Sequence, residues 1–153
     1  MRGRSLAQTF FSFCTQIMSR LCPDDQNTGP QQGTASFWMV LAALLGLTAV
    51  ALGAIAAHAL NDPRAAMAVE RASLYQLIHA VVLLYAAHLP GKLAAAARIL
   101  LLIGILGFCG AIELKYLFSL PALGVVAPAG GITLMLGWLM LAAAALRRPT
   151  SKT

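Results

Sequence analysis

The sequence predicts an all-α protein, an integral membrane four-helix transmembrane bundle with an N-terminal extension. Its 153 residues are 59% hydrophobic and only 10% charged, whereas about a quarter of the residues in a soluble domain are charged. The apolar residues form runs of about 20, the length that an α-helix needs to cross a hydrocarbon core of about 30 Å. The chain therefore has too little polar surface for water and enough apolar length for a membrane.

Residues 1–36 are interpreted as an extension, followed by a transmembrane domain at 37–146 and a basic tail at 147–153. Apolar residues recur in the extension at three- and four-residue spacing, which predicts an amphipathic helix in the headgroup region. These residues are Leu6, Phe10, Phe13, Ile17 and Leu21. A disordered tail and an organellar transit peptide are the alternatives. The stretch PDDQNTGPQQGTAS (23–36) has the composition of a linker.

Four spans are predicted, at residues 37–60, 72–89, 93–120 and 125–146. The segments between them, NDPRAAMAVER (61–71), Pro90 with Gly91, and SLPALG (119–124), contain breakers or charges that require water. The third run is longer than one crossing needs. Either Arg98 reaches the interface from one end, or Glu113 and Lys115 lie in the outer interface.

Small residues are expected on the helix faces that pack together. Lipid tails are as apolar as the helices, so no hydrophobic force drives the helices together, and they associate through close packing that small residues allow. In the first span these are Ala42, Gly46, Ala49, Gly53 and Ala56; in the fourth they are Gly130, Thr133, Gly137 and Ala144. Both sets fall on one face of a helical wheel.

The distribution of Lys and Arg predicts the orientation. One side would hold Arg2, Arg4, Arg20, Lys92, Arg98, Arg147, Arg148 and Lys152, and the other Arg64, Arg71 and Lys115. Eight cations against three place both termini in the cytoplasm, or on the matrix side if the protein is mitochondrial. The net charge of +6 is thus assigned to topology and not to nucleic-acid binding.

A group of polar residues is predicted near the outer face, formed by His58, Tyr75, Gln76, His79 and Glu113. One interpretation makes two imidazoles and a carboxylate a metal or proton-relay site. The other, which we favour, has Tyr75, Gln76 and His79 join helices through hydrogen bonds, with His58 ending the first span at the water boundary. Glu113 would then meet Arg64, Arg71 or water.

The sequence contains no motif for catalysis. We find no GxSxG, HExxH, P-loop or pair of close carboxylates. The three cysteines form no CxxC pair. We therefore expect a protein that is not an enzyme and has no cofactor and no metal site, with the lipid bilayer and a membrane protein or a second copy of itself as partners.

Three segments resemble a known family. GAIAAHAL (53–60), YQLIHAVVLL (75–84) and APAGGITLMLGWLMLA (127–142) are similar to the GAFGAHGL, YQxxHALALL and TPIGGxxFLLGWLLLA segments of the domain of unknown function 423 family, which is related to transmembrane protein 256. The resemblance implies a four-helix protein of the bacterial inner membrane whose role is not established. It carries over the following motif positions without a catalytic role: His58, Tyr75, Gln76, His79, Pro128, Gly130, Gly131, Gly137 and Trp138.

The sequence departs from this family at two places. Leu74 stands where an Arg often precedes the YQ pair, and Glu113 occupies an aromatic position. Two functions remain open: a non-enzymatic accessory or interaction bundle, and a small transporter, proton path or cofactor-binding protein that uses the outer polar group.

Overall fold

The computed structural model describes residues 30–147, with side chains from residue 33 onward. The chain divides into two compact units, Met1–Gly33 and Thr34–Thr153, and the bundle belongs to the second. The predicted amphipathic helix of the extension and the tail beyond Arg147 lie outside the described residues.

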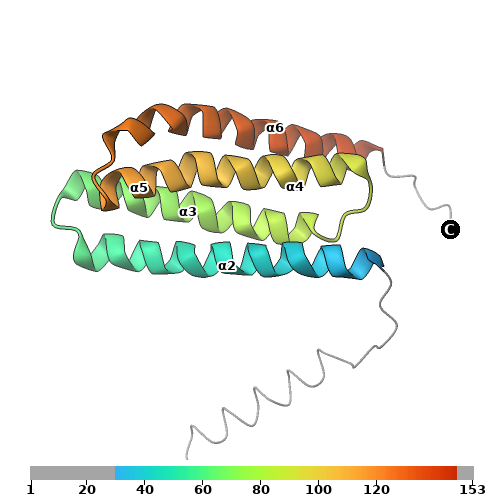
Figure 1. The fold of residues 1–153 in the computed structure, drawn as a ribbon, viewed down its shortest axis with the longest axis horizontal. Coiled ribbons are helices and arrows are strands. Elements are labelled where there is room, and N and C mark those ends of the chain that lie inside the picture. The colour runs from blue at the N-terminus through green and yellow to red at the C-terminus, as the bar shows by residue number, and fades with distance from the viewer. Residues whose placement is uncertain (1–29, 148–153) are drawn as a thin grey trace, which may run out of the picture. The chain divides into compact units, whose positions relative to one another are not determined.

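Within residues 30–147, four helical rods form the bundle, and they run antiparallel in Figure 1. The elements are α2 (Pro30–Ala59), α3 (Pro63–Ala86), α4 (Lys92–Ile105), the π-helix η1 (Leu106–Gly110), α5 (Ala111–Leu117), the 3₁₀-helix η2 (Pro121–Val125) and α6 (Val126–Leu146). Because α4, η1 and α5 continue one another, they form a single rod over Lys92–Leu117. All four rods are long and apolar enough to cross a membrane. The predicted fold class is confirmed.

Two helices begin earlier than predicted. The helix α2 starts at Pro30, inside the stretch interpreted as a linker, and α3 starts at Pro63 and not near Ala72. Proline is favoured in the first helical turn, and the Asp62 side chain accepts a hydrogen bond from the Arg64 backbone N–H at the start of α3. The polar residues at the start of these two helices were wrongly interpreted as loops. A helix can continue beyond the hydrocarbon region into water, and its residues there are polar like those of a loop.

The core lies between all four rods. Its buried members are Ala42, Leu83, Leu101, Ile105 and Leu134, contributed by α2, α3, α4 and α6. The rods α3 and α4–α5 bury more of their surface than α2 and α6, which flank them in Figure 1. Large apolar side chains on α2 and α6 therefore face outward, as lipid-facing residues do.

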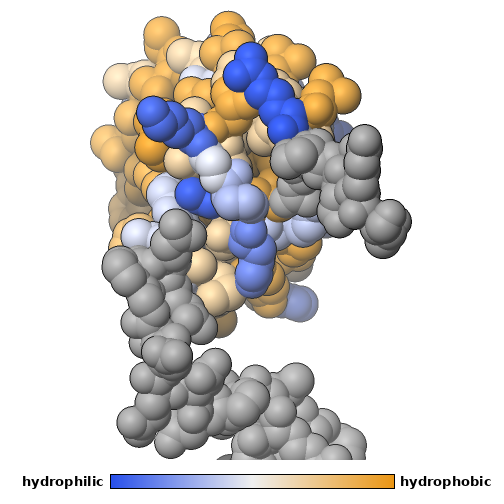
Figure 2. Space-filling model, turned by 90° about the vertical axis from the view of Figure 1, so that its right-hand side faces the viewer, coloured by the Kyte–Doolittle hydropathy of each residue, from blue (hydrophilic) through white to orange (hydrophobic). Residues whose placement is uncertain are grey.

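One end of the bundle is marked by polar side chains. Figure 2 views the end at which α4 begins and α6 ends, and hydrophilic residues gather there with hydrophobic residues around them. The segments Ala87–Gly91 and Arg147 lie at this end, whereas Leu60–Asp62 and Phe118–Leu120 lie at the other. The bundle thus has the polar end and apolar flank of a membrane-spanning protein.

Candidate functional site

Gln76 connects α3 to α2. Its side chain is buried, and Nε2 donates hydrogen bonds to the Leu45 carbonyl at 2.9 Å and to Thr48 Oγ1 at 2.8 Å. The Thr48 hydroxyl lies within 3.1 Å of the Leu44 and Leu45 carbonyls, to which it donates. Because lipid offers no partner for an amide, these bonds hold α3 against α2.

His79 connects α3 to α6. The Trp138 indole N–H donates to His79 Nε2 at 3.2 Å, and His79 Nδ1 lies 2.7 Å from the Tyr75 carbonyl. An indole nitrogen can only donate, so Nε2 carries no proton in this arrangement. The geometry therefore assigns His79 as the neutral imidazole with its proton on Nδ1, donated to Tyr75 one turn earlier. Both ring nitrogens are occupied by the protein.

Tyr75 extends this group to the third rod through its ring and not through its hydroxyl. The ring packs edge-to-face against Phe108 of η1, with centroids 5.7 Å apart, and lies nearly parallel to the His79 ring at 6.3 Å. Tyr75 is half exposed. Gln76, His79 and Tyr75 thus each contact a different neighbouring rod, and we call these three residues with Thr48 and Trp138 the interhelical polar cluster.

No hydrogen bond or ring contact joins the other two predicted residues to this cluster within residues 30–147. His58 lies in the last turn of α2 and is exposed. Glu113 is buried in α5, and no partner for its Oε1 is found in the described part of the chain. Over residues 30–147, no three His, Cys, Asp or Glu side chains come close enough to hold a metal ion.

Three residues of the polar framework were not identified from the sequence. Trp138 was carried over only as a motif position of the family, Thr48 was not considered, and Arg98 was considered only for the interface. In the structure Arg98 Nη1 donates to the carbonyls of Ala86 at 3.0 Å and Leu89 at 2.9 Å, just where α3 ends. The Ala86 carbonyl also accepts the Leu89 backbone N–H at 3.1 Å. Its guanidinium also lies 5.7 Å from the centre of the Trp38 ring. The sequence signal that could have identified these three residues is that each is a side chain with hydrogen-bonding groups inside an apolar run.

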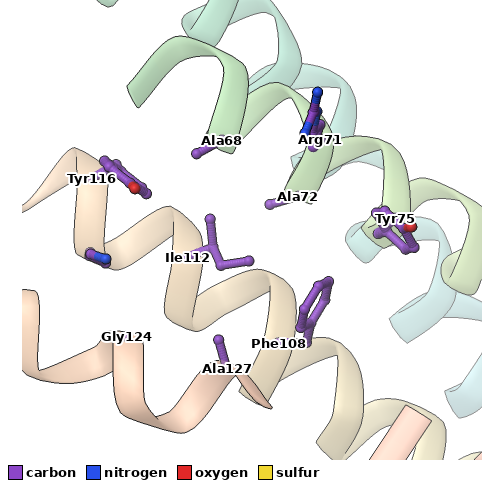
Figure 3. Close-up of a pocket in the computed structure, with 10 residues that line it drawn as sticks. Ala68, Arg71, Ala72, Tyr75, Phe108, Ile112, Tyr116, Gly124 and Ala127 are labelled. Atoms are coloured by element: carbon purple, nitrogen blue, oxygen red, sulfur yellow. The ribbon is translucent and has the colours of Figure 1, made fainter. Parts of the chain in front are cut away.

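A pocket of about 410 Å³ opens between α3, α5 and the start of α6 (Figure 3). Its lining comprises Ala68, Arg71, Ala72, Tyr75, Phe108, Ile112, Lys115, Tyr116, Gly124 and Ala127. Arg71 and Lys115 are the charged members. The pocket shares Tyr75 with the polar cluster and lies closer to the end that contains Leu60–Asp62 and Phe118–Leu120.

A comparison with protein families identifies the chain. Residues 52–131 match the family model described as "Protein of unknown function (DUF423)". The chain belongs to the DUF423 family. The resemblance predicted from the three motifs is confirmed.

Relatives of this DUF423 protein are bacterial membrane proteins by name. It is 34% identical to a UPF0382 membrane protein of Staphylococcus epidermidis over 72% of this chain and 95% of the relative. It is 30% identical to the UPF0382 membrane protein YwdK of Bacillus subtilis, over 72% and 96%. For a UPF0382 membrane protein of Haemophilus influenzae the identity is 33%, over 69% and 90%. No solved structure matches the chain.

The DUF423 match covers only part of the polar cluster. Tyr75, Gln76 and His79 lie within residues 52–131, whereas Thr48 and Trp138, which bond to Gln76 and His79, lie outside this range. Neither the family match nor the sequence motifs show that Thr48 pairs with Gln76 or that Trp138 pairs with His79. The structure shows both pairs.

Proposed function

We propose that this DUF423 protein is a non-enzymatic accessory bundle of the bacterial inner membrane. The observation that supports the proposal is the interhelical polar cluster: both nitrogens of His79 and the amide nitrogen of Gln76 bond to protein groups. A side chain whose hydrogen-bonding groups are used in this way joins helices, and few of these groups remain to bind a substrate.

The outward faces of the bundle favour contacts within the membrane. Leu47 and Val50 of α2 and Leu139 of α6 are exposed by about three fifths. Lipid covers such side chains, or the helices of another membrane protein or of a second copy do. A single cysteine introduced at Leu47 or at Leu139 should form disulfide-linked dimers on oxidation in membranes if two copies pack through these faces. A cysteine at Ala49, which is buried, is the matched control.

The charge distribution supports an orientation with both termini in the cytoplasm. Lys92, Arg98 and Arg147 lie towards one end of the bundle and Arg64, Arg71 and Lys115 towards the other, and the proposed orientation counts the Lys and Arg of both terminal segments with the first set. Reporter fusions at the C-terminus and in the 60–62 loop should report opposite sides of the membrane. A mitochondrial inner-membrane location, with termini in the matrix, is the alternative.

Replacement of His79 tests the proposal directly. His79→Leu should lower the yield and melting temperature of the purified protein, because it removes the acceptor of Trp138. His88→Leu is the matched control, since His88 is exposed just after the end of α3 and, over residues 30–147, its ring hydrogen-bonds only to the Leu84 carbonyl. Stoichiometric metal, haem or quinone that is present in wild type and in His88→Leu, and lost in His79→Leu, would refute an accessory role and establish a cofactor-binding protein.

A second candidate function, a small transporter or proton path, is favoured by Glu113. Its carboxyl group is buried in a membrane-spanning rod with an unpaired oxygen, and ionisable groups in such positions often mark transport pathways. Proton flux into proteoliposomes that Glu113→Gln abolishes would support this candidate. Glu70→Gln, at an exposed position of α3, is the control and should leave such flux unchanged.

A further inference from the structure

The pocket between α3, α5 and α6 combines two cations with an aromatic and apolar lining (Figure 3). We propose that it binds an anionic phospholipid, with the headgroup phosphate between Arg71 and Lys115 and an acyl chain along the apolar part of the lining. Neither the family description nor the names of the relatives assign a ligand.

The two cations are available to an anion. In the part of the chain that the structure describes, no carboxylate lies within ion-pair distance of Arg71 or Lys115. The Lys115 ammonium lies 5.1 Å from the centre of the Tyr116 ring, a cation–π contact that fixes its position without neutralising its charge. Two unneutralised cations that line one hollow attract a phosphate group.

The missing side chain of Gly124 makes room for the Lys115 ammonium. A Cβ atom at Gly124 would lie only 3.2 Å from Lys115 Nζ and 3.5 Å from its Cδ. The backbone of η2 at Gly124 therefore approaches the Lys115 side chain closely. The position of the Lys115 ammonium therefore depends on the backbone at Gly124, which leads into α6.

The position of the pocket in the span selects a lipid as the source of the phosphate. Arg71 lies about two turns from the start of α3 at Pro63, and Lys115 is two residues from the end of α5 at Leu117. These are the ends of spans, where headgroups lie. Phe108 and Ile112 line the pocket from the same rod as Lys115 and supply its apolar part.

Lipid binding by the full-length protein in detergent tests the proposal. Titration with phosphatidylglycerol and with phosphatidylcholine of the same acyl chains, followed by native mass spectrometry, gives a Kd for each. Each cation near an anionic lipid contributes a factor of about five in affinity. Wild type should therefore prefer phosphatidylglycerol by about tenfold or more, and the double variant Arg71→Gln/Lys115→Gln should lose this preference.

A matched double variant separates a defined site from general charge. Arg64→Gln/Arg147→Gln removes the same number of positive charges from exposed positions that do not line the pocket, so it should keep the wild-type preference. Equal loss in both double variants, or equal Kd values for the two lipids in wild type, would overturn the proposal. Competition by soluble glycerol phosphate at the same concentration as the lipid would assign the pocket to a soluble anion instead.

Milder variants keep the proposal testable if the double variant does not fold. Gly124→Ala should lower the phosphatidylglycerol preference about two- to threefold, because its Cβ displaces the Lys115 ammonium. Arg71→Lys retains the charge and should retain the preference. An unchanged preference in Gly124→Ala together with a lost preference in Arg71→Lys would contradict a site that depends on both cations.

Discussion

The contact between the α4–α5 rod and α6 differs from the contact between α2 and α3, although small residues line both. On α6, a Cβ atom at Gly130 would overlap the backbone of Gly107 and Phe108, and one at Gly137 would lie 3.0 Å from the Leu101 side chain. On α2, the nearest atom to a Cβ at Gly46 is a Leu77 methyl at 3.9 Å. A Cβ at Gly53 of α2 would lie 3.2 Å from Ser73 Oγ, which is also a side-chain atom. The first pair of rods thus touches through backbone at Gly130, whereas these two α2 glycines face side chains of α3.

The wider contact is the one that carries hydrogen bonds. Gln76 reaches across from α3 to the Leu45 carbonyl and Thr48 of α2, so side chains and not backbones fill the space between these two rods. Where glycines bring backbones together, dispersion and close packing stabilise the contact. The same small-residue pattern thus accompanies two different ways of joining helices in lipid.

The largest effect is expected at the close contact. Gly130→Ala should destabilise the bundle by about 3 kcal/mol, because the added methyl group must displace the backbone of the neighbouring rod. Unfolding of the purified protein by SDS, monitored by circular dichroism, measures this change.

The control for Gly130→Ala lies at the wider contact. Gly46→Ala should change stability by less than about 0.5 kcal/mol, since its Cβ meets only ordinary contacts and alanine favours a helix. Equal destabilisation by the two substitutions would show that the two contacts are alike and would remove the distinction drawn between them.

An intermediate effect is expected when the polar bridge is removed. Gln76→Leu should cost about 1 kcal/mol, because the Leu45 carbonyl and the Thr48 hydroxyl lose their donor while the leucine still fills the space. In a double-mutant cycle with Thr48→Val, measured by the same SDS unfolding, the coupling should be about 0.6 kcal/mol. Strictly additive effects would mean that the Gln76–Thr48 bond contributes nothing to stability.

The sequence predicted the class and the number of spans because both depend on composition and length. Hydropathy runs identify helices that cross lipid, but they do not show that Pro30 and Pro63 begin helices, since helical residues outside the hydrocarbon are polar. The small-residue faces were found by periodicity. The sequence did not show which face makes the close contact and which the wide one. Gly46 and Gly130 have the same local pattern and differ only in the atoms of the neighbouring helix that lie opposite them.

The candidate site could be predicted only in part. Gln76 and His79 stand out as polar groups in an apolar run, and their burial follows from the lack of water in the hydrocarbon region. Their partners are single residues on other helices, Thr48 and Trp138, and pairing across helices depends on rotation and depth. His58 and Glu113 were grouped with them by estimated depth alone, and in the described part of the chain neither residue hydrogen-bonds to a member of the cluster.

The smallest effect is expected at the bond between α3 and α6. Trp138→Phe removes the indole donor and keeps an aromatic ring, so it should cost about 0.6 kcal/mol, the typical value for a hydrogen bond between membrane helices. In a His79→Leu background the same substitution should be nearly neutral, because the acceptor is already absent. The indole N–H of Trp138 should also exchange with solvent deuterium more slowly in wild type than in His79→Leu, as observed by NMR. If the cost of Trp138→Phe were the same in both backgrounds, the ring would stabilise α6 by packing alone, and the hydrogen bonds of the polar cluster would join α3 only to α2.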